Sequence, residues 1–215
     1  MKILVIICHH VMNPHHLPNM EILHRYLLSQ EPEVLDYGGI SSQDDFAGME
    51  GPVIYFKYKM VNPALQFTKI CDFMTRYKDE LAYDWYVKIR PDLQLLEPIV
   101  FTSLSTDSIH ARARAYRGPR RVPYGMSVNG EGKWRHIVDC HYQEQETEVI
   151  LDDMLFIFHD DVIRKGAFEP FYDCNKQHEW TQSWAWKSRG IPLHVIGIYL
   201  VNSRHNTYSG HLNLA

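Results

Sequence analysis

The first hundred residues alternate between short apolar runs and segments whose apolar positions recur every three or four residues. Residues 2–8 form a continuous run rich in β-branched side chains, which is typical of a central parallel strand. Further strands are expected at residues 34–37, 53–58 and 85–89, and helices at residues 19–29 and 62–80. Gly38-Gly39 is expected to close the second strand. This alternation predicts a doubly wound α/β layer.

The second half has a less regular pattern. It predicts a short helix at residues 99–104, loops and short strands at 105–135, a strand or buried segment at 155–158, a helix at 175–188 and a last strand at 193–201. No linker rich in proline and glycine divides the chain, so one domain is expected over residues 1–215.

Composition narrows the class of protein. The apolar fraction of 45% and the charged fraction of 22% are ordinary for a globular protein. A net charge of −4 does not favour nucleic acid as a partner. The four cysteines match no CxxC pattern, and no apolar run is long enough to span a bilayer. With no secretory signal recognised, reduced thiols and a cytoplasmic location are expected.

The most informative segment is YDWYVKIRPDL, residues 83–93. Its aromatic and β-branched residues favour a buried strand, which Pro91 ends because proline cannot continue a ladder. Asp92 then lies just past the carboxyl end of a strand, where open α/β sheets bind ligands. A carboxylate beside Arg90 suits a divalent cation and a diphosphate. The alternative is a turn that carries a solvated aspartate.

Three groups of residues are expected to meet at this edge of the sheet. They are His9 and His10 after the first strand, Lys57 and Lys59 at the end of the third, and Arg90 and Asp92 after the fourth. Cations at this position would neutralise a diphosphate. The chain has neither GxGxxG nor GxxxxGK[ST], so the dinucleotide fingerprint and the P-loop are both absent.

A second candidate is the acidic pair Asp152 and Asp153, which precedes an apolar run. In an extended segment the two side chains point to opposite faces, so one can face a pocket. A buried carboxylate with a raised pKa can act as a general base. The alternative is a pair that caps the start of a helix.

Several histidines and tryptophans have both a functional and a structural interpretation. The clustered histidines between positions 9 and 16 fit no structural zinc spacing. His205 follows the last expected strand and suits Mn²⁺ alongside oxygen ligands, or it is a surface histidine in the tail. Among the tryptophans at 180, 184 and 186, core packing is favoured over stacking on a sugar.

The YDWYVKIRPDL strand after a helix, with an acidic pair some sixty residues later, resembles the GT-A class of nucleotide-sugar glycosyltransferases. Within that class the chain is similar to glycosyltransferase domains of algal viruses (chloroviruses) that build capsid glycans. The resemblance implies a GT-A-like, Rossmann-related fold with a mostly parallel sheet and helices on both faces. It also implies a nucleotide-binding half at residues 1–100, an acceptor-side half at 101–215, and a place within a longer multidomain protein in the host cytoplasm.

The resemblance also implies roles for individual residues. In the class, an Asp-x-Asp motif binds Mn²⁺, or Mg²⁺, and the donor diphosphate. Arg90 stands in the place of the first aspartate and Asp92 matches the metal ligand, with His205 or His211 as a later ligand. The positions that recognise the base would fall on His9, His10, Tyr37 and Lys57. The acceptor-side carboxylate would be Asp153, with Asp152 beside it.

These expectations give one function and two alternatives. The expected enzyme is a metal-dependent hexosyltransferase that moves a glucose- or rhamnose-type sugar from a UDP-sugar to a glycan hydroxyl, in viral capsid glycosylation. One alternative is a sugar-phosphate nucleotidyltransferase, against which the loop CHHVMNPHH argues because it is not rich in glycine. The other is a non-catalytic module that binds carbohydrate or nucleotide.

Overall fold

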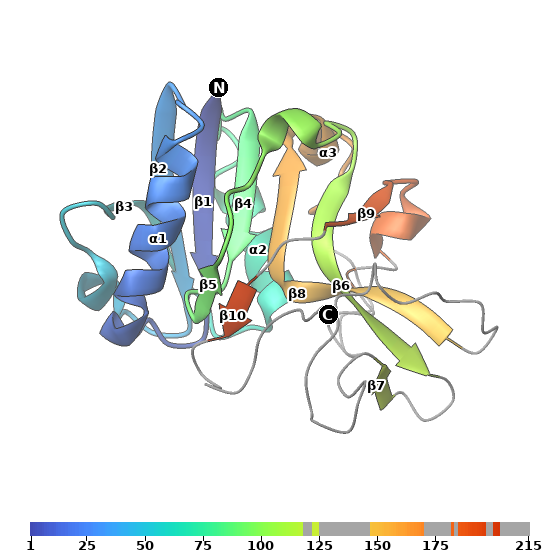
Figure 1. Cartoon of the computed structure of the whole chain (residues 1–215), viewed down its shortest axis with the longest axis horizontal. Helices are drawn as coiled ribbons and strands as arrows, with labels where there is room; N and C mark the ends of the chain where they lie inside the picture. Colours follow the sequence, from blue (N-terminus) through green and yellow to red (C-terminus); the bar gives the residue numbers. More distant parts are fainter. Residues whose placement is uncertain (118–121, 125–146, 170–181, 183–184, 197–199, 203–215) are drawn as a thin grey trace.

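The protein is built on one central sheet with a helix on each face (Figure 1). The computed structural model describes residues 1–117, 122–124, 147–169, 182, 185–196 and 200–202. The sheet has the order β3-β2-β1-β4-β8-β6-β7, with β9 beside β6, and β10 pairs with β5 in a separate two-stranded sheet. The strands are β1 (Lys2–Cys8), β2 (Val34–Ser41), β3 (Phe56–Val61), β4 (Trp85–Ile89), β5 (Leu93–Leu95), β6 (Ile109–Arg117), β7 (Val122–Tyr124), β8 (Thr147–His159), β9 (Leu193–Val195) and β10 (Leu200–Asn202).

The four strands β3, β2, β1 and β4 are all parallel. Alternate residues of β1 point to opposite faces, and each face packs against a helix. Ile3 and Val5 pack in the cluster that includes α1 (Leu17–Leu28), whereas Leu4 and Ile6 pack in the cluster that includes α2 (Gln66–Arg76). The predicted α/β fold is therefore confirmed.

The other half of the sheet is antiparallel around β8, which lies between β4 and β6. The expectation of only loops and short strands at residues 105–135 is wrong for β6, which spans nine residues. Ala111 pairs with Phe156 but Ala113 pairs with Leu151, so four residues of β8 lie opposite one residue of β6. Such a bulge bends the strand that carries it, and Figure 1 shows the first part of β8 directed away from the main sheet.

Two boundaries in the first half differ from the expectation. Strand β2 does not close at Gly38-Gly39 but continues to Ser41, because the two glycines leave room for aromatic rings on both faces. An added Cβ at Gly38 would lie 2.7 Å from the Phe73 ring, and one at Gly39 would lie 2.8 Å from the Phe46 ring. Strand β3 begins at Phe56, three residues later than predicted.

Helix α2 is shorter than the expected 62–80 and ends at Arg76. Its N-cap is Leu65. Asn62, the expected cap, accepts a hydrogen bond from the Ala64 amide in the turn before the helix.

The C-terminal expectations are partly corrected. The last strand is not continuous, because β9 and β10 belong to different sheets. The expected helix at 99–104 is the 3-10 helix η3 (Phe101–Ser103), and the apolar segment at 155–158 is the end of β8. Of the expected helix at 175–188, residues 182 and 185–188 are helical and the others lie outside the described residues.

Trp186 is fully buried, with its ring against Phe67 and Phe156, so core packing is confirmed for this tryptophan. Trp180 and Trp184 lie outside the described residues. Cys8 and Cys71 are buried and take part in no disulfide bond between described residues. No helix in the described ranges has the length and apolar character needed to cross a membrane.

Candidate functional site

The site forms where β1 and β4 end side by side. Ile7 pairs with Ile89, so the residues that follow each strand emerge at the same edge of the sheet. Those residues are His9 on one strand and the Arg90-Pro91-Asp92 turn on the other. The structure therefore brings together two of the three groups that were expected to meet there.

The Arg90-Pro91-Asp92 turn is held by an internal ion pair and by its neighbours. Arg90 Nε donates to Asp92 Oδ1 at 2.9 Å, and Arg90 Nη2 donates to Asp92 Oδ2 at 2.5 Å. The Arg90 amide donates to the Met154 carbonyl on β8, and Asn19 Nδ2 donates to the Pro91 carbonyl, both at 3.0 Å. The backbone of the turn is thus hydrogen bonded to both β8 and α1.

Asp92 is fully buried, whereas the Arg90 side chain is 14% exposed. Burial by itself would raise the pKa of Asp92, but the hydrogen bonds and charge of Arg90 outweigh it and the pKa is lowered, with smaller contributions from His9 and His16. Asp92 is therefore ionised at neutral pH, and its charge is balanced by Arg90 within the turn.

His9 is the second buried polar side chain at this edge. Its Nδ1 lies 2.8 Å from the Val11 carbonyl and 3.3 Å from the Val11 amide nitrogen, and the shorter contact, to an acceptor, assigns the proton to Nδ1. Burial lowers the pKa of His9 to about 4, so the ring is neutral at pH 7. The Nε2 atom then holds a lone pair, and it makes no hydrogen bond with any residue that the structure describes. His9 can accept a hydrogen bond there from a bound ligand.

Lys69, on α2, holds the backbone at this edge by hydrogen bonds. It is not among the residues predicted from the sequence. Its ammonium donates to the His9 carbonyl and to Ser42 Oγ, each at 2.9 Å, and the side chain is fully buried. Burial is the main cause that lowers the pKa of Lys69. One signal was present in the sequence: Gln66, Lys69 and Phe73 lie on the buried stripe of α2, and a lysine in such a stripe needs a partner.

Two predicted residues lie elsewhere. Tyr37 is buried in the middle of β2, opposite Val5, and its hydroxyl is hydrogen bonded to His24 Nδ1 at 2.7 Å. Lys57 does not end β3 but is its second residue, and it forms an ion pair with Asp36 at 2.6 Å. The expected position of Lys57 is wrong because β3 starts three residues later, which moves this lysine toward the amino ends of the strands.

Lys59, the neighbouring basic residue on β3, is engaged in another ion pair. Its ammonium lies 2.8 Å from Glu50 Oε1. His10 is exposed, and its Nδ1 is hydrogen bonded to Ser42 Oγ at 3.1 Å. Of the positions expected to recognise the base, His9 and His10 are therefore the two at the carboxyl edge.

The backbone of Asp152 and Asp153 lies in the bulge of β8. The next residue, Met154, is the one whose carbonyl accepts the Arg90 amide. The acidic pair is thus next to the candidate site in an extended strand, and the alternative of a helix cap is wrong. Its side chains, like His205 and His211, lie outside the described part of the chain.

The described residues do not fit the divalent cation expected from the sequence. No three histidine, cysteine, aspartate or glutamate side chains among them are grouped so that they would hold a metal. Asp92 has both carboxylate oxygens on Arg90 and no exposed surface. We therefore assign no chemical step to a metal at Asp92.

Comparison with known proteins identifies the fold. No family model matches the chain, and no curated protein matches its sequence. A putative glucose-1-phosphate thymidylyltransferase from Bacillus anthracis, solved in complex with a sucrose, is similar with a TM-score of 0.52 and 13% identity, over 94% of this chain and 89% of that one. A glycosyltransferase involved in glycosylation of the major capsid of PBCV-1 has a TM-score of 0.42 and 9% identity, over 91% and 81%.

At 13% identity the likeness to the thymidylyltransferase shows the fold alone. The chain has a GT-A-like, Rossmann-related α/β fold, as the resemblance found in the sequence implied.

Proposed function

We propose that this protein is a glycosyltransferase that moves a hexose from a UDP-sugar to a glycan hydroxyl. The observation that carries the proposal is the edge where β1, β4 and β8 meet. Neutral His9, the fixed Arg90–Asp92 pair and the bulge with the acidic pair all lie there. Ligands of open α/β sheets bind at the carboxyl ends of the strands.

The donor would contact the β1 and β4 side of this edge. His9 Nε2 is an acceptor that suits an N–H group of a nucleotide base or a hydroxyl group of ribose. Arg90 is the partly exposed cation of the turn. A guanidinium has five N–H donors, so it can bind a carboxylate and a phosphate oxygen at the same time. Such a cation stabilises the charge that develops on the departing diphosphate.

The acceptor would contact the β8 side. Asp153 lies one residue before Met154 and thus next to Arg90, which suits a carboxylate that takes the proton of the acceptor hydroxyl. Asp152 is its neighbour. The acceptor class in this proposal is a glycan, and the resemblance to chlorovirus domains suggests a capsid glycan.

The proposal is tested by transfer assays that use UDP-, GDP- and TDP-hexoses and a panel of oligosaccharide acceptors, with products identified by mass spectrometry. Asp153→Asn is expected to reduce transfer by about 10²-fold or more, as for the loss of a general base. Asp152→Asn is the matched control and is expected to have a smaller effect. Full activity in both variants would show that the base lies elsewhere.

The same assay tests the metal dependence expected from the sequence. Transfer is measured with Mn²⁺, with Mg²⁺ and with a chelator. Activity that a chelator abolishes would place the cation on residues outside the described ranges or on a rearranged Asp92. Equal activity with and without chelator would show that basic side chains bind the diphosphate without a metal.

A sugar-phosphate nucleotidyltransferase is the second candidate, because a putative thymidylyltransferase has a similar fold. The loop after β1 argues against it, because residues 8–16 contain no glycine or arginine. An assay with nucleoside triphosphates and hexose 1-phosphates separates the two functions. Release of pyrophosphate without transfer from UDP-sugars would support the nucleotidyltransferase.

A further inference from the structure

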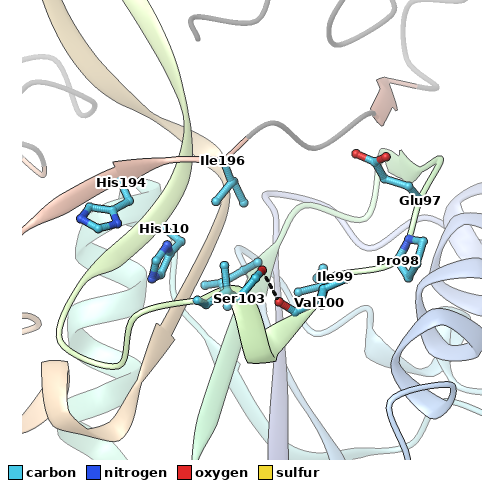
Figure 2. A pocket seen from close by; sticks show the side chains of 10 residues that line it. Glu97, Pro98, Ile99, Val100, Ser103, His110, His194 and Ile196 are labelled. Carbon is cyan, nitrogen blue, oxygen red and sulfur yellow. Dashed lines mark hydrogen bonds between the residues drawn. The ribbon is translucent and has the colours of Figure 1, made fainter.

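A pocket of about 470 Å³ lies apart from the Arg90–Asp92 turn. It is formed by the segment from β5 to η3 together with β6, β8, β9 and the residue after β9 (Figure 2). Its lining residues are Glu97, Pro98, Ile99, Val100, Ser103, Leu104, His110, Ile157, His194 and Ile196. This volume is within the range of pockets that hold small organic ligands, roughly 300–1,000 Å³.

His110 gives the clearest indication of a ligand. It is 2% exposed, and its Nε2 lies 2.8 Å from the Ser105 carbonyl. A carbonyl only accepts, so Nε2 carries the proton and Nδ1 holds a lone pair. Among the described residues nothing donates to Nδ1. A lone pair on a pocket wall that no protein group donates to can accept a hydrogen bond from a ligand or from water.

The charges of the lining define the class of ligand. The lining residues that the structure describes include no lysine or arginine to bind an anion, and they include one carboxylate, that of Glu97. In Figure 2 the His110 and His194 rings lie together on one side and Glu97 on the other. Isoleucine and valine side chains lie between the two sides. A neutral ring with hydroxyl groups at its edge and C–H groups on its faces matches this arrangement.

The pocket is also close to the candidate site along the chain. Glu97 follows Asp92 by five residues, through β5. Ile157 follows Asp153 by four residues on β8, which is at most about 13 Å of extended strand. A glycan that occupies the pocket with one unit could therefore reach the edge of the sheet with a neighbouring unit.

We propose that this pocket binds a neutral sugar unit of a glycan, with His110 Nδ1 accepting a hydrogen bond from one of its hydroxyl groups. The identification of that glycan as the acceptor rests on the proposed function, whereas binding of the sugar itself does not.

The experiment is an NMR titration of the full chain with maltose, lactose, cellobiose and sucrose, without any nucleotide sugar. Saturable shifts are expected at the methyl groups of Val100 and Ile157 and at the His194 ring, with a Kd on the order of 10 mM for at least one disaccharide. Glucose 6-phosphate, an anionic sugar, is expected to bind more weakly than the neutral disaccharides.

Two variants and one control test whether the sugar binds in this pocket. Val100 is 48% exposed at the pocket, so Val100→Trp is expected to fill it and weaken binding at least tenfold. Val61→Trp, at a 51% exposed position on β3, is the matched control and is expected to bind like the unmodified protein. His110→Phe keeps the ring and removes the acceptor, so about tenfold weaker binding is expected. If His110→Phe does not fold, the comparison of the two tryptophan variants still shows whether the sugar binds in the pocket.

The proposal is overturned if no disaccharide gives a saturable shift at about 100 mM, roughly tenfold above the expected Kd. Equal binding by Val100→Trp and Val61→Trp would overturn it as well, as would tighter binding of glucose 6-phosphate. Saturable disaccharide binding in a protein that shows no transfer would instead contradict the proposed function and leave the pocket assigned.

Discussion

At the level of single residues, burial and hydrogen bonds determine which side chains of the site are charged. Asp92 and Arg90 are two residues apart and neutralise each other inside the protein. His9, a few residues after the start of the chain, is kept neutral by burial. The expected behaviour of both groups can be measured without knowledge of the substrate.

Arg90→Met should remove the guanidinium from the buried Asp92 carboxylate and lower the free energy of unfolding by about 3–5 kcal/mol at pH 7. Adding Asp92→Asn should recover part of that loss, because no buried charge remains. Urea unfolding of the single and double variants measures this. Arg164→Met breaks an ion pair of similar length on the surface, with 77% of the arginine side chain exposed, and should leave the urea midpoint almost unchanged.

The same pair predicts a pH dependence. Because the pKa of Asp92 is lower in the folded state than in the unfolded state, its stabilisation is present above about pH 4 and is lost as the pH falls below that value. The difference in stability between the unmodified protein and Arg90→Met should therefore shrink toward pH 3. A difference that stays constant from pH 7 to pH 3 would contradict the assignment.

His9 should titrate with a midpoint of about 4 in imidazole NMR. Between about pH 6.5 and 4 the unfolded chain binds a proton at His9 that the folded protein does not, so falling pH destabilises the fold. The unmodified protein should therefore lose about 3 kcal/mol relative to His9→Asn over this range. A midpoint near 6.5 would show that the ring is not buried as described.

At the scale of elements, close packing explains why β2 continues through two glycines. Phe73 on α2 and Phe46 in η2 (Phe46–Met49) approach the strand from opposite faces, where any larger side chain would meet their rings. Sequence patterns favour a turn at Gly-Gly. The packing of the two aromatic side chains overrides that preference.

Gly38→Ala should lower the free energy of unfolding by about 1–3 kcal/mol, because the new methyl group overlaps the Phe73 ring. Gly38→Ala combined with Phe73→Leu should cost less than the sum of the two single changes, because the smaller side chain makes room. Gly51→Ala is the control, since an added Cβ there has no atom within 4 Å. Additive effects of Gly38→Ala and Phe73→Leu would contradict this account.

At the scale of the whole molecule, ligand binding should raise the melting temperature. A UDP-hexose at about 100 times its Kd adds about 2.7 kcal/mol to the folded state. For a chain of 215 residues this corresponds to a rise of about 5–10 °C. Differential scanning fluorimetry with UDP-, GDP- and TDP-hexoses measures it, and equal melting temperatures with and without every nucleotide sugar would contradict the proposed donor class.

Local sequence patterns predict the α/β fold class, the two main helices, the strand at Trp85–Ile89 and the position of the Arg90-Pro91-Asp92 turn at its end. These features follow from local patterns: apolar periodicity selects a strand or a helix, and proline cannot continue a central strand. The edge of the sheet where a ligand would bind follows from strand direction alone.

Which side chains meet at that edge depends on contacts between segments that are far apart in the sequence. In the folded protein Lys57 pairs with Asp36 away from the edge, and the buried Lys69 donates to the His9 carbonyl. Burial lowers the pKa of His9, and the pairing of β6 with β8 places Asp152 and Asp153 in a bulge. Each of these depends on atoms from segments distant in the sequence, through burial, pairing register and close packing. A local pattern contains none of that information, because a shift of a few residues in one strand changes every contact its side chains make.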